Sequence, residues 1–347
     1  MDFLVGLVEG FYGRPWSQSQ RLAYADFGSD LGFTAHLHCP KDDPFLRKRW
    51  REDWVDDAFA DLNALATQYQ ARGLAWGVGL SPFELYLAYD REARSALKAK
   101  VERICELGGT LLGLLFDDMP GDIADLAQRQ AEIAADVLEW ASGMRVLVCP
   151  TYYSLDPQLE RYFGAMPDQY RGRLGEALPG EVEIFWTGPE VCSRSISAQH
   201  LAAVRAEFGR KLVLWDNYPV NDGALRSEHL YLSPLADREP EGRAHLHGHF
   251  CNPMNQAYLS LPAISGLAGL YSAAASEARL SARLGAQTWT HLRDDLDEFR
   301  DEGLSGMGPE RCAELAQQYA ALPGEAAGEV AAWLRGEYTF DPACLTG

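Results

Sequence analysis

The sequence has no long apolar run, no CxxC pair and no excess of positive charge, and each absence excludes a class of protein. No apolar stretch reaches the roughly 18 residues of a membrane-spanning helix, so we expect no membrane span. The seven cysteines stand at positions 39, 105, 149, 192, 251, 312 and 344, a scattered pattern typical of reduced cytosolic thiols. The first residues are typical of a strand rather than of a signal peptide. We therefore expect a cytoplasmic location.

Basic residues are scarce, with 31 Lys and Arg against 50 Asp and Glu and a formal net charge of −19. This excess of negative charge repels phosphate backbones and anionic membrane surfaces. We therefore expect neither a nucleic acid nor a membrane as partner. A neutral small molecule, a neutral sugar or a peptide carrying a sugar fits the charge better.

Eight apolar segments of strand length recur along the first 250 residues or so, and each is followed by polar, Gly or Pro residues. They are Leu4–Glu9, Phe33–Cys39, Leu74–Leu80, Thr110–Phe116, Arg145–Cys149, Glu183–Trp186, Lys211–Trp215 and His247–Cys251. Helix-patterned stretches lie between most of them, including 53–72, 92–107, 123–142 and 197–208, while 216–246 shows no long helix. Near-continuous apolar strands that alternate with amphipathic helices are typical of a parallel sheet covered by helices.

This alternation predicts an α/β fold, a (β/α)8 TIM barrel with a small helical appendage. We expect the catalytic barrel at residues 1–260, and the last barrel helix with a helical C-terminal segment at 261–347. A doubly wound open sheet is the alternative. However, residues 10–15 place bulky aromatic side chains between two glycines, which makes a poor phosphate-binding loop after the first strand.

Polar and aromatic residues follow the predicted strands, at the end of a barrel where active sites are built. The candidates are Gly10, Lys41, Asp117, Asp118, Tyr153, Trp215, Asn217, Asp222 and Asn252. Aromatic faces with Asn and Asp side chains suit a sugar ring, which has apolar CH faces and a polar hydroxyl edge. Taken alone, an Asp after a strand is equally well explained as a helix cap, and an aromatic residue there as core.

The adjacent aspartates Asp117 and Asp118 pose a geometric problem, because successive side chains of a strand point to opposite faces. Pro120 disfavours helical geometry at Met119 and encourages the chain to turn here. If strand geometry ends at Asp118, both carboxylates can face one site.

Two groups of histidines raise a rival hypothesis, a metal-dependent barrel hydrolase. His36 and His38 form an HxH pair in a predicted strand, which puts both rings on one face. His245, His247 and His249 lie near the last strand. Because these residues lie inside the strands rather than at their ends, hydrogen-bonded core histidines are the simpler interpretation. Serine catalysis has little support, since the sequence lacks a G-x-S-x-G elbow.

The residues after the strands resemble, in order, the motifs of the family 84 glycoside hydrolases. The matching stretches are Gly6–Trp16, Cys39–Pro44, Phe116–Asp118, Cys149–Tyr153, Trp186–Pro189, Leu214–Tyr218, Asn221–Asp222 and Asn252–Met254. Members of this family are retaining β-N-acetylglucosaminidases, including the enzymes that remove O-linked GlcNAc from Ser and Thr. The resemblance implies a GlcNAc-bearing glycoside or glycoprotein as substrate, and no metal or organic cofactor.

The resemblance also implies roles for the candidate residues. Asp117, as an anion, orients the substrate's 2-acetamido group, whose carbonyl oxygen attacks C1 to form an oxazoline. Asp118 protonates the leaving oxygen and then deprotonates water, a division of labour that mutual repulsion of the two carboxylates favours. For the sugar, it implies Tyr153, Trp215 and Asn217 around the acetamido group, Asp222 and Asn252 at O4 and O6, and Gly10 and Lys41 at O3. A non-catalytic sugar-binding barrel is the remaining alternative; the natural aglycone and the oligomeric state are not indicated.

Overall fold

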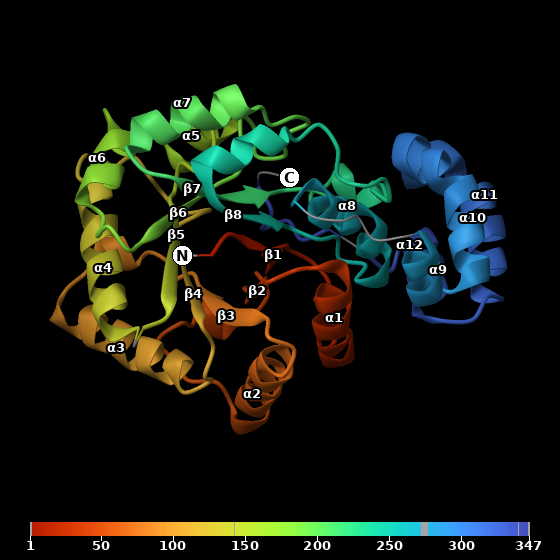
Figure 1. Cartoon of the computed structure of the whole chain (residues 1–347), viewed down its shortest axis with the longest axis horizontal. Coiled ribbons are helices and arrows are strands. Elements are labelled where there is room, and N and C mark those ends of the chain that lie inside the picture. Colours follow the sequence, from red (N-terminus) through yellow and green to blue (C-terminus); the bar gives the residue numbers. More distant parts are fainter. Residues whose placement is uncertain (1, 142, 272–276, 339, 346–347) are drawn as a thin grey trace.

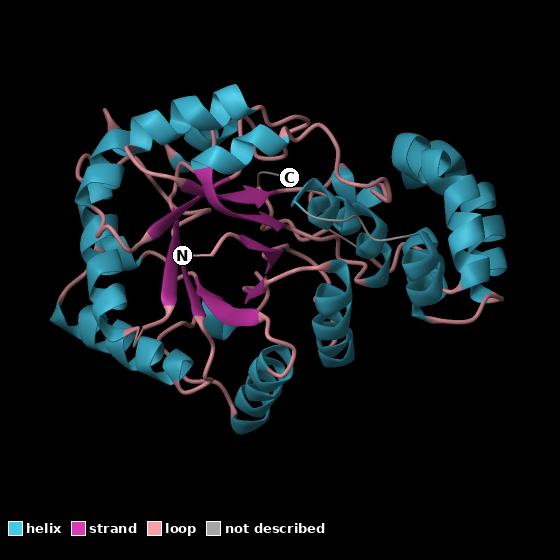
Figure 2. Cartoon of the chain, in the orientation of Figure 1, coloured by secondary structure: helices cyan, strands magenta, loops and turns pink. Residues whose placement is uncertain are grey.

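The eight predicted strands form a closed barrel in the computed structural model, which describes residues 2–141, 143–271, 277–338 and 340–345 (Figure 1). Neighbouring strands pair in parallel and in sequence order, and β8 closes the barrel against β1. Helices cover the outside of the sheet, as Figure 2 shows. The predicted (β/α)8 TIM barrel is therefore confirmed.

The strand bounds agree with the predicted ones to within two residues at each end. The strands are β1 (Leu4–Glu9), β2 (Ala35–His38), β3 (Ala75–Leu80), β4 (Leu111–Leu115), β5 (Arg145–Cys149), β6 (Glu183–Trp186), β7 (Leu212–Asp216) and β8 (Leu246–Cys251). Nearly every strand residue is buried. Apolar runs rather than alternating patterns are therefore required, because one face of each strand meets the barrel interior and the other meets the helices.

The helices of the barrel include the four that the sequence pattern predicts. They are α1 (Gln18–Leu31), α2 (Asp56–Gln70), α3 (Arg91–Cys105), α4 (Leu126–Trp140), α5 (Gln158–Phe163), α6 (Tyr170–Ala177), α7 (Ala198–Phe208) and α8 (Leu261–Tyr271). The predicted end of α4 at residue 142 lies outside the described residues. Residues 216–246 contain no long helix, as expected, and only the short 3₁₀ turns η3 (Arg226–Glu228) and η4 (Pro240–His245).

The hydrophobic periodicity of the sequence does not predict helix α1, but the residues at the start of this helix form a capping box. The Ser17 hydroxyl accepts a hydrogen bond from the Gln20 backbone N–H at 3.2 Å, and the Gln20 side chain accepts one from the Ser17 N–H at 2.7 Å. This reciprocal pair satisfies two N–H groups that would otherwise lack partners at a helix start. The S-x-x-Q pattern was therefore the sequence signal for this helix.

Among the described residues, four further helices form the C-terminal appendage, beside the barrel (Figure 1). They are α9 (Glu277–Leu284), α10 (Ala286–Asp297), α11 (Gly303–Ala320) and α12 (Glu325–Leu334). The appendage contacts the loop after β7, where the Trp333 indole N–H donates to the Ser227 carbonyl at 3.1 Å and the Leu230 N–H donates to the Phe299 carbonyl at 3.2 Å. The predicted boundary at residue 260 stays a prediction, and residues 272–276, 339 and 346–347 lie outside the described part. In the described ranges, no helix combines the length and the apolar character that a bilayer crossing requires.

A buried carboxylate on α12 ties the appendage to the barrel. Glu329 accepts hydrogen bonds from the backbone N–H groups of Tyr258 (3.2 Å) and Leu259 (3.0 Å) and from the Gln20 side chain (2.8 Å). Burial raises the pKa of Glu329 to about 8, and these N–H donors only partly offset that rise. The folded protein therefore binds a proton at Glu329 more tightly than the unfolded chain does.

We expect the stability contributed by this proton to depend on pH. It is fully present below the unfolded pKa of 4.5 and is lost as the pH rises through about 8. Glu329→Gln has no such proton to lose. The free energy of unfolding of wild type should therefore fall by several kcal/mol relative to that of the variant between pH 5 and pH 9, at about 1.4 kcal/mol per pKa unit. Urea unfolding of both proteins at the two pH values measures this change. A difference that stays constant with pH would contradict it.

Candidate active site

A cavity of about 470 Å³ opens at the carboxyl ends of the strands, and all nine candidate residues line it. They are Gly10, Lys41, Asp117, Asp118, Tyr153, Trp215, Asn217, Asp222 and Asn252. The barrel thus brings together side chains from positions more than 200 residues apart. Their individual roles stay predictions.

Both adjacent aspartates line the cavity, because the backbone has already left strand geometry before Asp117. Strand β4 ends at Leu115, and Asp118 has a φ of +55°, in the left-handed region. A non-glycine residue held there is uncommon, and Asp is among the residues that tolerate it best. Neither aspartate caps the following helix, since α4 begins only at Leu126. The capping interpretation therefore fails for both.

Asp117 has one paired and one unpaired carboxylate oxygen. Its Oδ2 contacts the Lys41 ammonium, and both side chains are at least nine-tenths buried. Burial opposes the charge of Lys41, but Asp117 and Asp118 outweigh it and raise the pKa of the ammonium. Among the residues that the structure describes, none provides a hydrogen-bond partner for the buried Oδ1 atom of Asp117. A buried acceptor of this kind is costly unless a ligand supplies the donor.

Asp118 is held by two tyrosines. The Tyr12 hydroxyl lies 2.6 Å from Oδ2, the Tyr153 hydroxyl lies 3.2 Å from Oδ1, and the Lys41 ammonium lies 3.8 Å from Oδ2. Burial first, and the neighbouring Asp118 charge second, raise the pKa of Tyr12 well above its usual value. Tyr12 therefore stays a neutral hydroxyl that orients the Asp118 carboxyl.

Trp215, Asn217, Asn252 and Gly10 form a connected wall of the cavity. The Asn217 Oδ1 accepts from the Trp215 indole N–H and from the Asn252 side-chain N–H, each at 3.0 Å. The Asn252 Oδ1 accepts from the Gly10 N–H at 3.2 Å. The Asn217 Nδ2 donates one hydrogen to the Val191 carbonyl at 2.8 Å, so its second hydrogen is available to a ligand.

Asp222 lies in the same cavity and is only 7% exposed. Its Oδ2 accepts a hydrogen bond from the Tyr12 backbone N–H at 2.8 Å, which fixes the loop after β1 against the loop after β7. Burial raises the pKa of this carboxyl.

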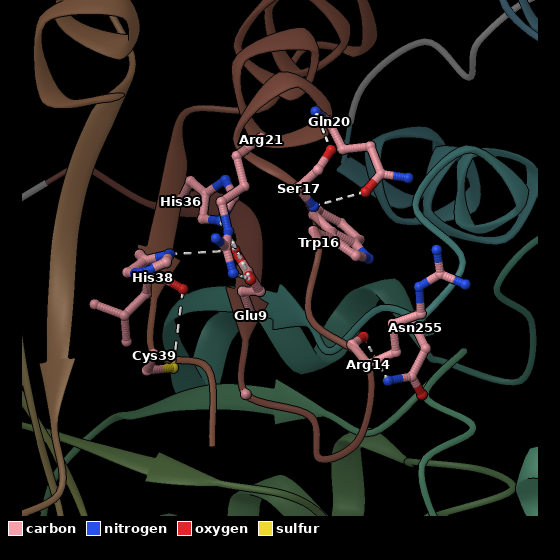
Figure 3. A network of polar contacts seen from close by, with 12 residues as sticks. Glu9, Arg14, Trp16, Ser17, Gln20, Arg21, His36, His38, Cys39 and Asn255 are labelled. Atoms are coloured by element: carbon pink, nitrogen blue, oxygen red, sulfur yellow. Dashed lines mark hydrogen bonds and ion pairs between the residues drawn. The ribbon is translucent and has the colours of Figure 1, made fainter. Parts of the chain in front are cut away.

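His36 and His38 lie away from this cavity and do not line it. Figure 3 shows both rings together with Arg21 around the buried Glu9 carboxylate. The His38 Nδ1 lies 3.3 Å from the Glu9 Oε2, and the His36 Nδ1 lies 2.5 Å from the Tyr69 hydroxyl. In the described part of the chain, no three His, Cys, Asp or Glu side chains gather as a metal-binding group. The metal-hydrolase alternative therefore has no ligand set here.

Of the histidines near the last strand, His249 is accounted for by packing in the core, whereas His245 and His247 are only half-buried. His249 is buried, with its Nε2 3.0 Å from the Asp216 Oδ2 and its Nδ1 2.9 Å from the Tyr271 hydroxyl. Asp216 in turn accepts hydrogen bonds from the Arg238 guanidinium at 2.7 and 2.8 Å. These contacts form a satisfied polar cluster in the core, as the core interpretation expects.

Several residues that line or border the cavity were not among the candidates. They are Tyr12, Arg47, Cys149, Thr187, Val191, Cys192, Val220 and Cys344. Tyr12 follows Gly10 by two residues at the end of β1, a position that could have marked it. Arg47, whose guanidinium donates to the Asp118 carbonyl at 3.3 Å, lies in a loop with no comparable signal. Cys344 comes from the far end of the sequence.

Comparisons with known proteins show which proteins this chain resembles. Protein O-GlcNAcase of Rattus norvegicus and that of Mus musculus are each 29% identical over 279 residues, which cover 78% of this chain and 30% of theirs. The chain thus spans less than a third of the length of these curated relatives. A solved variant of the Thermobaculum terrenum O-GlcNAc hydrolase superposes with a TM-score of 0.77 at 27% identity, over 95% of this chain and 80% of that one. The family model for beta-N-acetylglucosaminidase matches residues 5–300, and the chain belongs to that family.

Proposed function

We propose that the chain is a retaining β-N-acetylglucosaminidase that hydrolyses terminal β-linked GlcNAc with the help of the substrate's own 2-acetamido group. The observation that carries this proposal is the buried, unpaired Oδ1 of Asp117. An acetamido N–H would supply the missing donor. Membership of the beta-N-acetylglucosaminidase family supports the proposal independently.

In the proposed reaction the two aspartates act in sequence on one substrate. Asp117, whose Oδ2 contacts the Lys41 ammonium, accepts the acetamido N–H and turns the carbonyl oxygen toward C1. That oxygen bonds to C1 as the bond to the leaving oxygen breaks, and Asp118 gives its proton to the leaving oxygen. Asp118 then takes a proton from water, which attacks C1 and opens the oxazoline. Two inversions at C1 retain the β configuration.

The other candidate residues are assigned to the remaining parts of the sugar. We assign Trp215 and Tyr153 to the acetamido methyl group and the second Asn217 N–H to the acetamido oxygen. Asp222 and Asn252 then bind O4 and O6, and the Gly10 carbonyl and Lys41 bind O3. The relatives are named for O-GlcNAc, which supports a GlcNAc-bearing glycoside or glycoprotein as substrate. The proposed location is the cytoplasm, which suits the buried thiols Cys39, Cys149 and Cys251.

The proposal is tested with two aryl glycosides that differ only at C2. An aryl N-acetyl-β-glucosaminide should be hydrolysed, and the matching β-glucoside, which lacks the acetamido nucleophile, should not. A thiazoline that mimics the oxazoline should inhibit strongly, because intermediate mimics bind tightly. Equal hydrolysis of both glycosides would contradict the proposal. Binding of the glucosaminide without hydrolysis would favour the sugar-binding alternative.

Gly10 provides a test of the sugar-binding wall. A Cβ atom at Gly10 would lie 2.3 Å from the Trp215 Cζ2 and 2.7 Å from its Cη2, so Gly10→Ala must displace the indole. Because a shift of about 1 Å can cost roughly 100-fold in rate, we expect kcat/KM for the aryl glucosaminide to fall by one to two orders of magnitude. Gly180→Ala is the matched control, since nothing lies within 4 Å of its Cβ position. Unchanged kcat/KM in Gly10→Ala would contradict the proposed contact of Trp215 with the sugar.

A further inference from the structure

The segment that follows α12 is attached to the loop after β1. Tyr338 is only 9% exposed, and the Arg14 guanidinium lies 4.8 Å from the centre of its ring. Arg14 also lies 3.9 Å from the Glu337 carboxylate. Since the same loop holds Tyr12, this attachment brings the segment after α12 back from the appendage to the barrel.

Residues 340–345, which we call the strap, lie at the mouth of the candidate active site. Cys344 lines the cavity that contains Asp117 and Asp118. Asp341, Ala343 and Leu345 line an adjoining hollow of about 990 Å³, whose other walls include Asp118. Tyr12 and Lys41 also border both spaces. The strap therefore lies beside the carboxylate proposed to protonate the leaving oxygen.

The strap is a small local structure rather than part of the core. It contains a turn in which the Ala343 N–H donates to the Asp341 Oδ1 at 2.8 Å and the Cys344 N–H donates to the Asp341 carbonyl at 2.9 Å. Phe340 is 42% exposed and Leu345 is 48% exposed. A short segment with exposed apolar side chains opens at low free-energy cost compared with a buried helix or strand.

The position of the strap has a consequence for the aglycone. Whichever group leaves must have its oxygen within reach of Asp118, so the rest of the aglycone extends from that carboxylate toward the mouth of the cavity. The strap occupies one side of this path. A small aryl group needs little space beyond Asp118, whereas a polypeptide continues in two directions from the modified residue.

We propose that the strap determines aglycone specificity: it leaves room for a small aglycone and must be displaced by a polypeptide. This inference rests on the proposed function, because it takes Asp118 as the acid. It predicts that the full chain discriminates against GlcNAc-bearing polypeptide relative to a small aryl glycoside. Removing the contacts of the strap relieves that discrimination.

The test replaces residues 340–345 with a Gly-Ser sequence of the same length and compares kcat/KM for two substrates. For a GlcNAc-bearing peptide, kcat/KM should rise by about tenfold, and for the aryl glucosaminide it should change by less than about twofold. Val55→Ser, at a 62% exposed apolar residue just before α2, controls for loss of surface apolar area. Equal changes for both substrates, no change, or a fall for the peptide alone would overturn the inference. Thermal unfolding verifies that the variant is folded.

A second measurement does not depend on turnover. Because Cys344 lines the cavity, filling the cavity with the thiazoline should slow alkylation of Cys344 by a maleimide severalfold, as followed by peptide mapping. An unchanged alkylation rate with bound thiazoline would show that the strap does not border the occupied site. Failure of the proposed function would look different from failure of this inference. In that case the wild-type chain would hydrolyse neither the aryl glucosaminide nor the GlcNAc-bearing peptide.

Discussion

Asp117→Asn is expected to lower kcat/KM for an aryl N-acetyl-β-glucosaminide on the order of 10²–10³-fold, the usual cost of removing a preorganised electrostatic group from a transition state. As the acetamido oxygen attacks C1, positive charge develops on the amide nitrogen, and an Asn side chain offers no negative charge to stabilise it. The substitution also removes the carboxylate that contacts the buried Lys41 ammonium. The loss should be similar for good and poor leaving groups, because Asp117 transfers no proton to the aglycone.

Two controls make this result interpretable. The same Asp→Asn change at the exposed Asp57 should leave kcat/KM unchanged. Binding of the thiazoline should weaken in Asp117→Asn, because the ring of the mimic occupies the place of the acetamido group and contacts the Asp117 carboxylate. Full activity of Asp117→Asn on the aryl substrate would refute the assignment of Asp117 as the acetamido partner.

Asp118→Asn is expected to show a loss that depends on the leaving group. For a poor leaving group such as an alkyl or seryl oxygen, kcat/KM should fall on the order of 10²–10⁴-fold, the usual contribution of a general acid. For a nitrophenyl group, which departs with little protonation, the first step should be largely retained. Asn also tolerates the left-handed backbone at position 118, where φ is +55°, so the substitution leaves the turn intact.

The informative quantity is the ratio between the loss of kcat/KM for a poor leaving group and the loss for a nitrophenyl group. A plot of kcat/KM against the acidity of the departing phenol should be steeper for Asp118→Asn than for wild type or Asp117→Asn. Equal losses for all leaving groups would instead mean that Asp118 has an orienting role like that proposed for Asp117.

The barrel was predictable because the pattern of apolar residues along the chain reflects how each strand is buried. Strands such as Leu111–Leu115 are buried on both faces and so read as continuous apolar runs. The parallel arrangement then places the residues after the strands on one rim, and the nine candidates follow from that rule together with the family resemblance. Neither step requires any knowledge of side-chain contacts.

The features that escaped prediction depend on contacts between distant parts of the chain. The left-handed backbone at Asp118 fits its place beside Tyr12 and Tyr153, neither of which is near it in sequence. The segment just before the strap is attached to the barrel through Arg14, which packs against Tyr338, a residue far from it in sequence. Periodicity and local propensity describe single elements, and they contain no information about such pairs. The unpaired Oδ1 of Asp117 is likewise visible only once every neighbour is in place.

The most direct measurement of the central claim is the hydrolysis of aryl glucosaminides whose acetamido methyl group carries zero, one, two or three fluorine atoms. Fluorine withdraws electrons from the carbonyl oxygen without changing the leaving group. If that oxygen is the nucleophile, kcat/KM should fall steeply along the series, by roughly tenfold or about 1.4 kcal/mol for each fluorine. A rate that is independent of fluorine content would contradict substrate assistance and would require a nucleophile from the protein.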